Sequence, residues 1–282
     1  MVITRLVGGL GNQMFQYAAG YSLARRTNST LLLDLSWYAE KNSSVWVMDY
    51  ALDCFALSPH KVDPTQYKVV DRIRGVDRLR TRTVKEFKEK GLPYDEQIWD
   101  AGDRVVLDGY WQSEKYFAAY RSELLKEFTF TAPISRACEK LEEQITSCES
   151  VSLHVRRGDY ASHAQTNATH GLMPLGYYID AVESIQKRHK DITVFVFSDD
   201  PDWCSENIKI KAPVTYVSGN KGFEDMKLMS LCRHNVIANS SFSWWGAWLN
   251  TNAHKIVIAP KKWFADKGLD SRDIVPDSWE RI

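Results

Sequence analysis

Residues 150–160 read SVSLHVRRGDY, an apolar strand that runs directly into a histidine, two arginines and an aspartate. Residues 192–200, ITVFVFSDD, repeat this arrangement, because a continuous apolar run of strand length ends in two carboxylates. A third strand with a polar end, NVIANSS, follows at residues 235–241. Helix-like segments separate the three, one beginning at Pro174 and one at Phe223. Strands that alternate with helices predict a parallel sheet covered by helices on both faces.

The polar ends of these three strands are expected to lie together, since parallel strands end at one edge of a sheet and ligands bind outside that edge. Alternation along the first strand places His154 and Arg156 on one side. Arginine matches phosphate oxygens in a bidentate fashion, so a small anion such as a diphosphate is predicted here. Asp159 is expected to orient Arg157. An arginine–aspartate bridge with a purely structural role is the alternative.

The first 35 residues form a β-α-β pattern around the turn GGLGN. A dinucleotide fingerprint would need a small residue where Met14 stands, and no P-loop motif is present, so neither nucleotide motif is supported. A glycine turn that opens a helix still favours an anion or a hydroxyl-rich ligand. A tight turn without a ligand is an equally good interpretation.

We therefore expect an α/β protein of two Rossmann-like domains with parallel sheets that face a central crevice, divided as residues 1–140 and 141–282. Residues 68–90 carry nine basic and four acidic side chains. This stretch is interpreted as a solvated helix or mobile arm, with peripheral contact to an anionic membrane as the alternative.

The charge balance excludes some function classes. With 36 Lys+Arg and 36 Asp+Glu the formal net charge is zero, which argues against a nucleic-acid partner bound by bulk electrostatics. The five cysteines are scattered without a CxxC pair, so neither a disulfide framework nor a zinc site is indicated. No export signal or transmembrane run is recognised, and a cytoplasmic location is expected, with the inner membrane as a peripheral site.

Two further motifs have alternative interpretations. Asp200 and Asp202 form a D-x-D pattern, which in nucleotide-sugar transferases holds a divalent metal, but Asp200 before Pro201 is also a typical helix N-cap. The cap is favoured, with Asp199 free to accept hydrogen bonds from a base edge. In ANSSFSWWGAWLN, the polar residues are suited to capping a helix or to phosphate contacts, and at least two of the three tryptophans are expected in the core.

Three motifs occur in order, GGLGNQMFQYA, HVRRGDY and ANSSFSWWGAWL, together with DGYWQSEKYF. In this combination the chain resembles the α-1,2-fucosyltransferase family, glycosyltransferase family eleven, in its soluble bacterial form. The resemblance implies a GT-B-like fold and an inverting transfer of L-fucose from GDP-β-L-fucose to the 2-hydroxyl of a terminal β-galactoside, as in O-antigen synthesis. GDP-fucose is then a co-substrate, and no cofactor or obligatory metal is expected. Residues 36–100 match no motif, and acceptor choice is expected to reside there.

The resemblance also assigns residues. Arg156 would contact the diphosphate, with His154, Asp159 and Asn12 as the other catalytic residues. Asp34, Asp159 and His154 remain candidates for the general base. The donor-binding residues would be Gly9, Gly11, Gln13, Arg157, Asp199, Asp200, Asn239, Ser240, Ser241 and Ser243. The alternatives are a fucosyltransferase of other regiochemistry, a metal-dependent D-x-D transferase and a non-catalytic module that binds a nucleotide or glycan.

Overall fold

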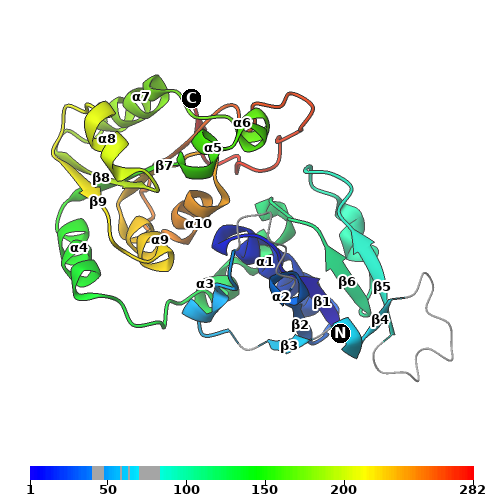
Figure 1. Cartoon of the computed structure of the whole chain (residues 1–282). Coiled ribbons are helices and arrows are strands. Elements are labelled where there is room, and N and C mark those ends of the chain that lie inside the picture. The colour runs from blue at the N-terminus through cyan, green and yellow to red at the C-terminus, as the bar shows by residue number, and fades with distance from the viewer. Residues whose placement is uncertain (40–47, 58, 63, 70–82) are drawn as a thin grey trace. The chain divides into compact units, whose positions relative to one another are not determined.

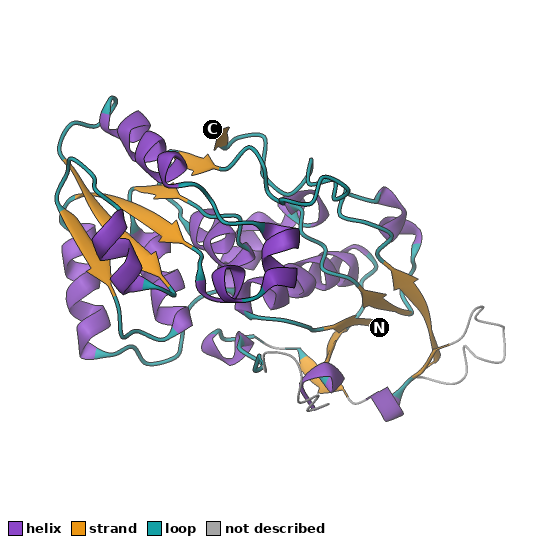
Figure 2. Cartoon of the chain, turned by 45° about the horizontal axis from the view of Figure 1, so that its top comes forward, coloured by secondary structure: helices purple, strands orange, loops and turns teal. Residues whose placement is uncertain are grey.

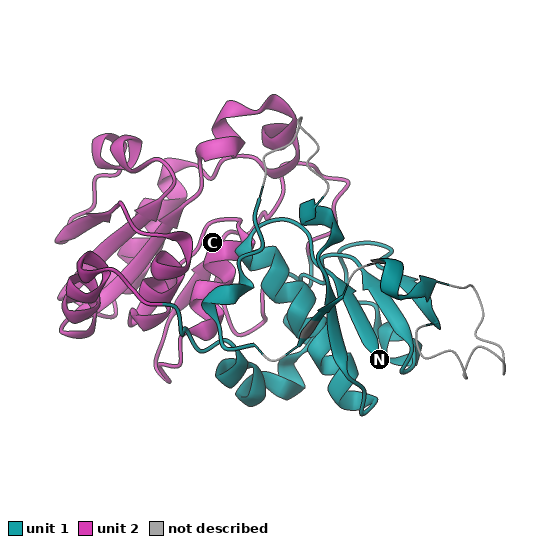
Figure 3. Ribbon diagram, turned by 60° about the horizontal axis from the view of Figure 1, so that its bottom comes forward, with its two compact units in different colours: residues 1–132, 272–274 teal, residues 133–271, 275–282 magenta. Residues whose placement is uncertain are grey.

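The protein is an α/β structure with two six-stranded sheets, seen here in a computed structural model (Figures 1 and 2). The structure describes residues 1–39, 48–57, 59–62, 64–69 and 83–282. The chain divides into two compact units (Figure 3). Unit 1 comprises residues 1–132 and 272–274, and unit 2 comprises residues 133–271 and 275–282.

Unit 1 contains a sheet in the order β3-β2-β1-β6-β5-β4, and every described strand pairing is parallel. Its strands are β1 (Val2–Arg5), β2 (Leu31–Asp34), β3 (His60–Val62), β4 (Lys68–Val69), β5 (Thr83–Lys88) and β6 (Val105–Asp108). Its α-helices are α1 (Leu10–Arg26), α2 (Ser36–Ala39) and α3 (Arg121–Glu127). Short 3-10 turns occur at Leu52–Cys54, Pro64–Gln66, Glu96–Asp100, Glu114–Tyr116 and Ala118–Tyr120.

The β-α-β unit expected in the first 35 residues is confirmed as β1-α1-β2. Helix α1 begins after Gly9 and buries most of its length against the sheet, which explains its mixture of aromatic and small residues. Gly20 allows the close approach, because a Cβ there would lie 2.9 Å from the Leu31 side chain. Three buried side chains of the unit 1 sheet form a further apolar cluster: Ile3, Val84 and Val106.

The helix or arm expected at residues 68–90 is wrong for the described part of that segment. Residues 68–69 form β4, and residues 83–88 form β5, which pairs in parallel with β6. Val84 is fully buried in this sheet, and that burial outweighs the high charge of the segment. Residues 70–82 lie outside the described residues, as does the membrane contact considered for them.

Unit 2 contains a second parallel sheet, in the order β12-β11-β10-β7-β8-β9. Its strands are β7 (Glu149–Val155), β8 (Ile192–Ser198), β9 (Val214–Val217), β10 (His234–Val236), β11 (Val257–Ala259) and β12 (Glu280–Arg281). Its helices are α4 (Arg136–Thr146), α5 (Gly158–Ser162), α6 (Ala164–His170), α7 (Leu175–Gln186), α8 (Pro201–Asn207), α9 (Gly222–Leu231) and α10 (Ser241–Leu249).

Helices cover both faces of this sheet, as the alternation of elements predicts. Val151, Leu153 and Val155 of β7 pack with α7 and α8 in one apolar cluster. Ser152 and His154 face the other side, where Ser152 accepts a hydrogen bond from the Asn235 amide and His154 contacts the ring of Phe242. The alternation therefore separates a core side from a side that carries polar groups.

The expected domain division shifts in two places. A boundary between residues 140 and 141 would cut α4, which packs on β7 and α9 and so belongs wholly to unit 2. Near the other end, residues 272–274 return to unit 1, because the Asp273 carboxylate accepts hydrogen bonds from the Tyr94 N–H and the Lys115 ammonium. Among the described residues, no helix combines the length and apolar character needed to cross a bilayer.

Candidate active site

The polar ends of three adjacent strands meet at the carboxyl edge of the unit 2 sheet. Strands β10, β7 and β8 are neighbours in the sheet order, and all three run in parallel. The loops that follow them carry residues 156–159, 199–200 and 237–240. We call this set the unit 2 edge. Its composition agrees with the prediction that these strand ends converge.

Arg156 bridges two carboxylates at this edge. One terminal nitrogen lies 2.7 Å from Asp159 Oδ1, and the other lies 2.8 Å from Asp199 Oδ2. The guanidinium also lies 5.4 Å from the centre of the Tyr160 ring. About a quarter of the side chain is exposed, 27%, so the group is held in place and still open to solvent. Its remaining N–H groups are available to an anion.

Arg157 is held by a different set of groups. Its Nε lies 3.0 Å from Asp200 Oδ2, and the guanidinium stacks 3.6 Å from the centre of the Trp203 ring. The expectation that Asp159 orients Arg157 is therefore wrong, since Asp159 pairs with Arg156. The cause is the neighbouring strand β8, whose end supplies Asp200 and α8. Within the described part of the chain, the two terminal nitrogens of Arg157 have no protein partner.

Asp199 binds the start of the arginine loop from two sides. Its Oδ1 accepts a hydrogen bond from the Arg157 backbone N–H at 2.8 Å, while its Oδ2 pairs with Arg156. Gly158 makes this approach sterically feasible, because a Cβ there would lie 2.6 Å from Asp199 Oδ2. Both carboxylate oxygens of Asp199 are thus engaged by the chain itself, and a base edge would have to share them.

Three buried polar atoms near this edge lack any partner within the described residues: His154 Nδ1, His170 Nδ1 and Asn239 Oδ1. The Asn239 amide N–H groups donate to the carbonyls of His170, Gly171 and Trp263, which holds the carboxamide firmly. A buried polar atom without a partner costs free energy unless a ligand or water satisfies it. These atoms therefore mark where a polar ligand would be recognised.

His154 is almost fully buried, with 5% of its surface exposed. Burial, together with the charge of Arg156, lowers the pKa of His154 to about 4, although Asp199 acts in the opposite direction. The imidazole is therefore neutral near pH 7. A neutral ring can donate or accept a hydrogen bond, which suits it to contact a ligand rather than to carry charge.

The polar residues before α10 act largely as a helix cap. The Ser240 hydroxyl accepts from the Phe242 N–H at 3.3 Å, and the Ser243 hydroxyl donates to the Ser240 carbonyl. Ser241 opens the helix and is half-buried. The prediction that at least two of the three tryptophans lie in the core is confirmed, because all three are buried: Trp244, Trp245 and Trp248.

The glycine turn lies at the carboxyl edge of the unit 1 sheet, after β1. Gly8 has a φ of +74°. Gly9 is the N-cap residue of α1, and no side chain caps the helix there. Gly11 is buried in the first turn of α1. Gln13 is fully buried, and its amide bonds the backbone of Gly8, Asp49 and Ala51. Gln13 therefore shapes the turn instead of facing a ligand.

Asn12 and Asp34 also belong to unit 1. The Asn12 carboxamide oxygen accepts a hydrogen bond from Gln112 at 2.9 Å. Asp34 is buried, and its two oxygens accept from the Ser36 N–H and the Tyr67 hydroxyl, at 2.9 and 2.6 Å. Arg5 Nε lies 3.6 Å away. A carboxylate that already has these three neighbours is poorly placed to act as a general base.

In the D-x-D pattern, Asp200 caps helix α8, which confirms the interpretation that the sequence favours. Asp200 Oδ1 accepts from the Trp203 N–H at 3.3 Å, and its Oδ2 pairs with Arg157, so both oxygens are engaged. Asp202 lies in the first turn of α8.

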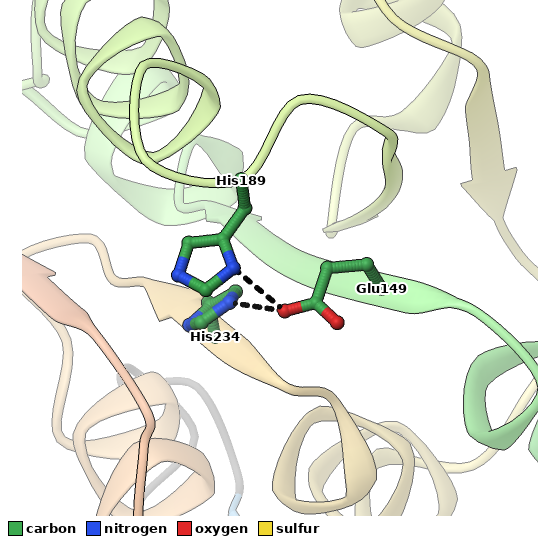
Figure 4. Close-up of side chains that lie close together, drawn as sticks. All are labelled: Glu149, His189 and His234. Atoms are coloured by element: carbon green, nitrogen blue, oxygen red, sulfur yellow. Dashed lines mark hydrogen bonds and ion pairs between the residues drawn. The ribbon is translucent and has the colours of Figure 1, made fainter.

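A second group with metal-ligand chemistry lies in unit 2, at the start of β7 and β10. His189 Nδ1 and His234 Nε2 lie 3.0 and 2.8 Å from Glu149 Oε1 (Figure 4). His234 Nδ1 accepts a hydrogen bond from the Ile256 backbone N–H. A neutral His234 therefore carries its proton on Nε2, toward Glu149, and has no lone pair there for a metal. The trio is a hydrogen-bonded cluster that joins two strands to the end of α7.

Trp203 and His170 are site residues that sequence reasoning missed. Trp203 could have been predicted from the sequence, because it occupies the first turn of a helix that follows a strand ending in two aspartates. His170 stacks on Tyr160 with ring centres 4.7 Å apart, and no motif in the sequence indicates that contact.

The chain is similar in sequence to bacterial glycosyltransferases. The family model described as Glycosyl transferase family 11 matches residues 99–282. The chain is 37% identical to the alpha-1,2-colitosyltransferase of Escherichia coli, with 100% of this chain and 99% of the relative covered. It is 34% identical to the O-antigen biosynthesis glycosyltransferase WbnK of Escherichia coli, with 97% and 98% covered.

Among solved structures, POFUT1 in complex with GDP-fucose aligns with a TM-score of 0.50 at 13% identity, covering 88% of this chain and 93% of that one. This likeness concerns the fold. Together with the two parallel sheets, it confirms the expected GT-B-like α/β class.

Proposed function

The chain belongs to glycosyl transferase family 11 and is a glycosyltransferase, and we propose that it moves L-fucose from GDP-β-L-fucose to the 2-hydroxyl of a terminal β-galactoside. The transfer would invert the anomeric carbon and serve O-antigen or oligosaccharide synthesis. The observation that carries the proposal is the unit 2 edge. Two guanidinium groups are braced there by three carboxylates, beside three buried polar atoms that have no partner in the part of the chain that the structure describes.

The chemistry of such a transfer matches this edge. As the acceptor hydroxyl attacks the anomeric carbon, negative charge grows on the departing diphosphate. Fixed N–H donors aimed at those oxygens stabilise the transition state more than the ground state. Arg156 and Arg157 are held by carboxylates and by Trp203, so little reorientation is needed when the charge develops. We assign both arginines to the diphosphate, with Arg156 as the main catalytic residue.

We assign the remaining donor contacts to groups with unused capacity. His154 Nδ1 and Asn239 Oδ1 are suited to hydroxyl or base hydrogen bonds, and Ser241 at the start of α10 is suited to a phosphate oxygen. Asp199 would receive the base edge while it holds Arg156. Of the three candidates for the general base, Asp159 is favoured, because only one of its oxygens has a partner among the described residues, whereas both oxygens of Asp34 are engaged.

Colitose is the main alternative to fucose as the donor sugar. One relative that covers the whole chain is named a colitosyltransferase, and colitose is L-fucose without its 3-hydroxyl. A site built to hydrogen-bond that hydroxyl rejects the deoxy sugar by a factor of about 10⁴–10⁵, whereas a site without such partners discriminates much less. We infer fucose, because the buried polar atoms that have no partner among the described residues suit a donor that offers more hydroxyls.

The test is a competition between donors. The purified chain is incubated with GDP-fucose, GDP-colitose and an array of β-galactosides, and the product linkage is determined by NMR. We expect α-1,2-fucosyl products and a clear preference for GDP-fucose. Preference for GDP-colitose would replace the donor, another linkage would replace the regiochemistry, and GDP binding without turnover would favour a non-catalytic module.

A further inference from the structure

The DGYWQ segment, residues 108–112, follows β6 at the carboxyl edge of the unit 1 sheet, next to the glycine turn after β1. The donor chemistry assigned to the unit 2 edge makes no use of it. After Gly109, Tyr110 is exposed and Trp111 is buried. Gln112 donates a hydrogen bond to Asn12.

Trp111 has a backbone conformation that a bulky residue rarely adopts. Its φ is +56°, in the left-handed region, and its side chain is fully buried. Such a conformation costs free energy and persists only where the surrounding structure enforces it. Residues of this kind cluster at functional sites, which indicates that this turn has a functional role.

Glu89 enforces the turn. Its two carboxylate oxygens accept hydrogen bonds from the backbone N–H groups of Tyr110 and Trp111, at 2.7 and 2.9 Å. Gly109 leaves room for this contact, because a side chain there would overlap Glu89. Gln16 adds a third support by donating to the Gly109 carbonyl. The backbone of the segment is therefore fixed from several sides.

This rigid turn presents one large aromatic side chain to solvent. Tyr110 is 44% exposed, one of four exposed large apolar side chains among the described residues. Trp37, another of the four, follows β2 at the same edge and packs against Tyr38 with ring centres 5.0 Å apart. The Tyr38 hydroxyl donates to the Gly8 carbonyl, which ties this aromatic pair to the glycine turn.

Hydrogen-bonding groups lie beside the aromatic ones. Gln112 donates to Asn12 at 2.9 Å, so the DGYWQ segment and the glycine turn share an amide pair. Asn12 is partly exposed, and no group among the described residues accepts a hydrogen bond from its N–H₂ group, so both N–H donors can serve a ligand. An exposed ring beside fixed amides is the chemistry that binds a neutral, hydroxyl-rich ring with one apolar face. A β-galactoside has that character, because its axial 4-hydroxyl leaves the opposite face apolar.

We propose that Tyr110, whose backbone Glu89 holds and which lies two residues before Gln112 of the Asn12–Gln112 pair, is the platform on which the acceptor sugar stacks, with Trp37 on the same edge of the sheet. This inference rests on the proposed function for its ligand class. Tyr110 then acts through its ring, since stacking uses the aromatic face and does not require the hydroxyl.

Initial-rate kinetics with GDP-fucose and a β-galactoside test the proposal. We expect Tyr110→Ala to raise the KM for the acceptor at least about tenfold, while the KM for GDP-fucose and the slow transfer of the donor sugar to water stay within about twofold of wild type. Tyr110→Phe should behave like wild type, because the ring is kept. Leu269→Ala, which removes an exposed apolar side chain in unit 2, is the matched control.

An acceptor KM for Tyr110→Ala within twofold of wild type would overturn the inference, as would an equal rise for Tyr110→Phe. If the wild type uses no GDP-fucose at all, the proposed function fails separately. Saturation-transfer NMR with a β-galactoside, with and without GDP, then decides. Binding that is present in wild type and lost in Tyr110→Ala supports the platform, and binding that is equal in both or absent from both overturns it.

Discussion

The carboxyl edges of the two sheets are built from the same topology and carry opposite chemistry. The unit 2 edge holds two arginines between three aspartates, with buried polar atoms for which the described residues supply no partner. The unit 1 edge holds Arg5 against Asp34, Glu86 and Asp108, and exposes the rings of Trp37 and Tyr110. The first arrangement suits an anion with directional acceptors, and the second suits a neutral sugar. Two sheets of the same topology thus differ in chemistry because the loops after their strands differ.

The largest expected effect tests the anion side of this comparison. Arg156→Ala should lower the transfer rate by about 10²–10³, because a fixed donor to the leaving diphosphate is lost. Arg156→Lys should restore little, since an ammonium cannot bridge Asp159 and Asp199 as a planar fork does. The measurement is kcat with GDP-fucose, with circular dichroism to verify the fold. A folded Arg156→Ala variant with wild-type turnover would remove this residue from the diphosphate site.

A smaller loss is expected from Gly158→Ala. The new methyl group would meet Asp199 Oδ2 at 2.6 Å and displace the carboxylate that holds Arg156. We expect kcat to fall by about tenfold to a hundredfold, because a small misplacement of a catalytic group is costly. Gly176→Ala is the matched control, since a Cβ there meets nothing within 4 Å. Equal kcat values in the two variants would show that Asp199 does not position Arg156.

On the sugar side, Glu89→Gln should disturb the platform without touching the donor site. The amide keeps one acceptor oxygen but turns an N–H₂ group toward a backbone N–H, so one of the two bonds is lost. We expect the acceptor KM to rise severalfold and stability to fall by about 1–3 kcal/mol. Glu96→Gln, at an exposed position, is the control. An unchanged acceptor KM would show that the strained turn does not contribute to acceptor binding.

Acid sensitivity should be concentrated in unit 2. His154 has a folded pKa of about 4, below the ordinary value of 6.5, so only the unfolded chain gains this proton between those values. Its contribution to stability is thus complete above pH 6.5 and is lost as the pH falls toward 4, at up to about 1.4 kcal/mol per pH unit. Urea titrations at pH 7, 6 and 5 should show a shallower decline for His154→Gln than for wild type. Parallel declines would mean that His154 is not the group responsible.

The smallest effect is expected from chelation. Asp200 uses both oxygens within the chain, as a helix cap and as the partner of Arg157, so the D-x-D pattern has little left to offer a metal. Transfer assayed after EDTA treatment and dialysis should equal that of the untreated protein. Activity that disappears with EDTA and returns with Mn²⁺ or Mg²⁺ would revive the metal-dependent alternative.

Local patterns predicted much of the fold. The β1-α1-β2 unit, the strands β7, β8 and β10, and the cap at Asp200 all follow from periodicity and from residue types that act over a few positions. The segment 83–88 was misassigned, because its charges resemble a solvated helix and its place in the sheet depends on β6, which follows some twenty residues later. The expected boundary between residues 140 and 141 lies inside α4, a helix whose place in unit 2 depends on its packing on β7 and α9.

The sequence by itself determined that His154, the two arginines and the aspartates gather at one edge, because parallel strands bring their carboxyl ends together whatever the details of the loops. Only the tertiary structure decided which aspartate holds which arginine, that Gln13 and Asp34 are engaged by the chain, and that Tyr110 is exposed beside a buried Trp111. The physical reason is the separation along the chain over which each kind of interaction acts. Strand and helix patterns arise between near neighbours, whereas ion pairs and exposure depend on side-chain directions between segments far apart in the chain.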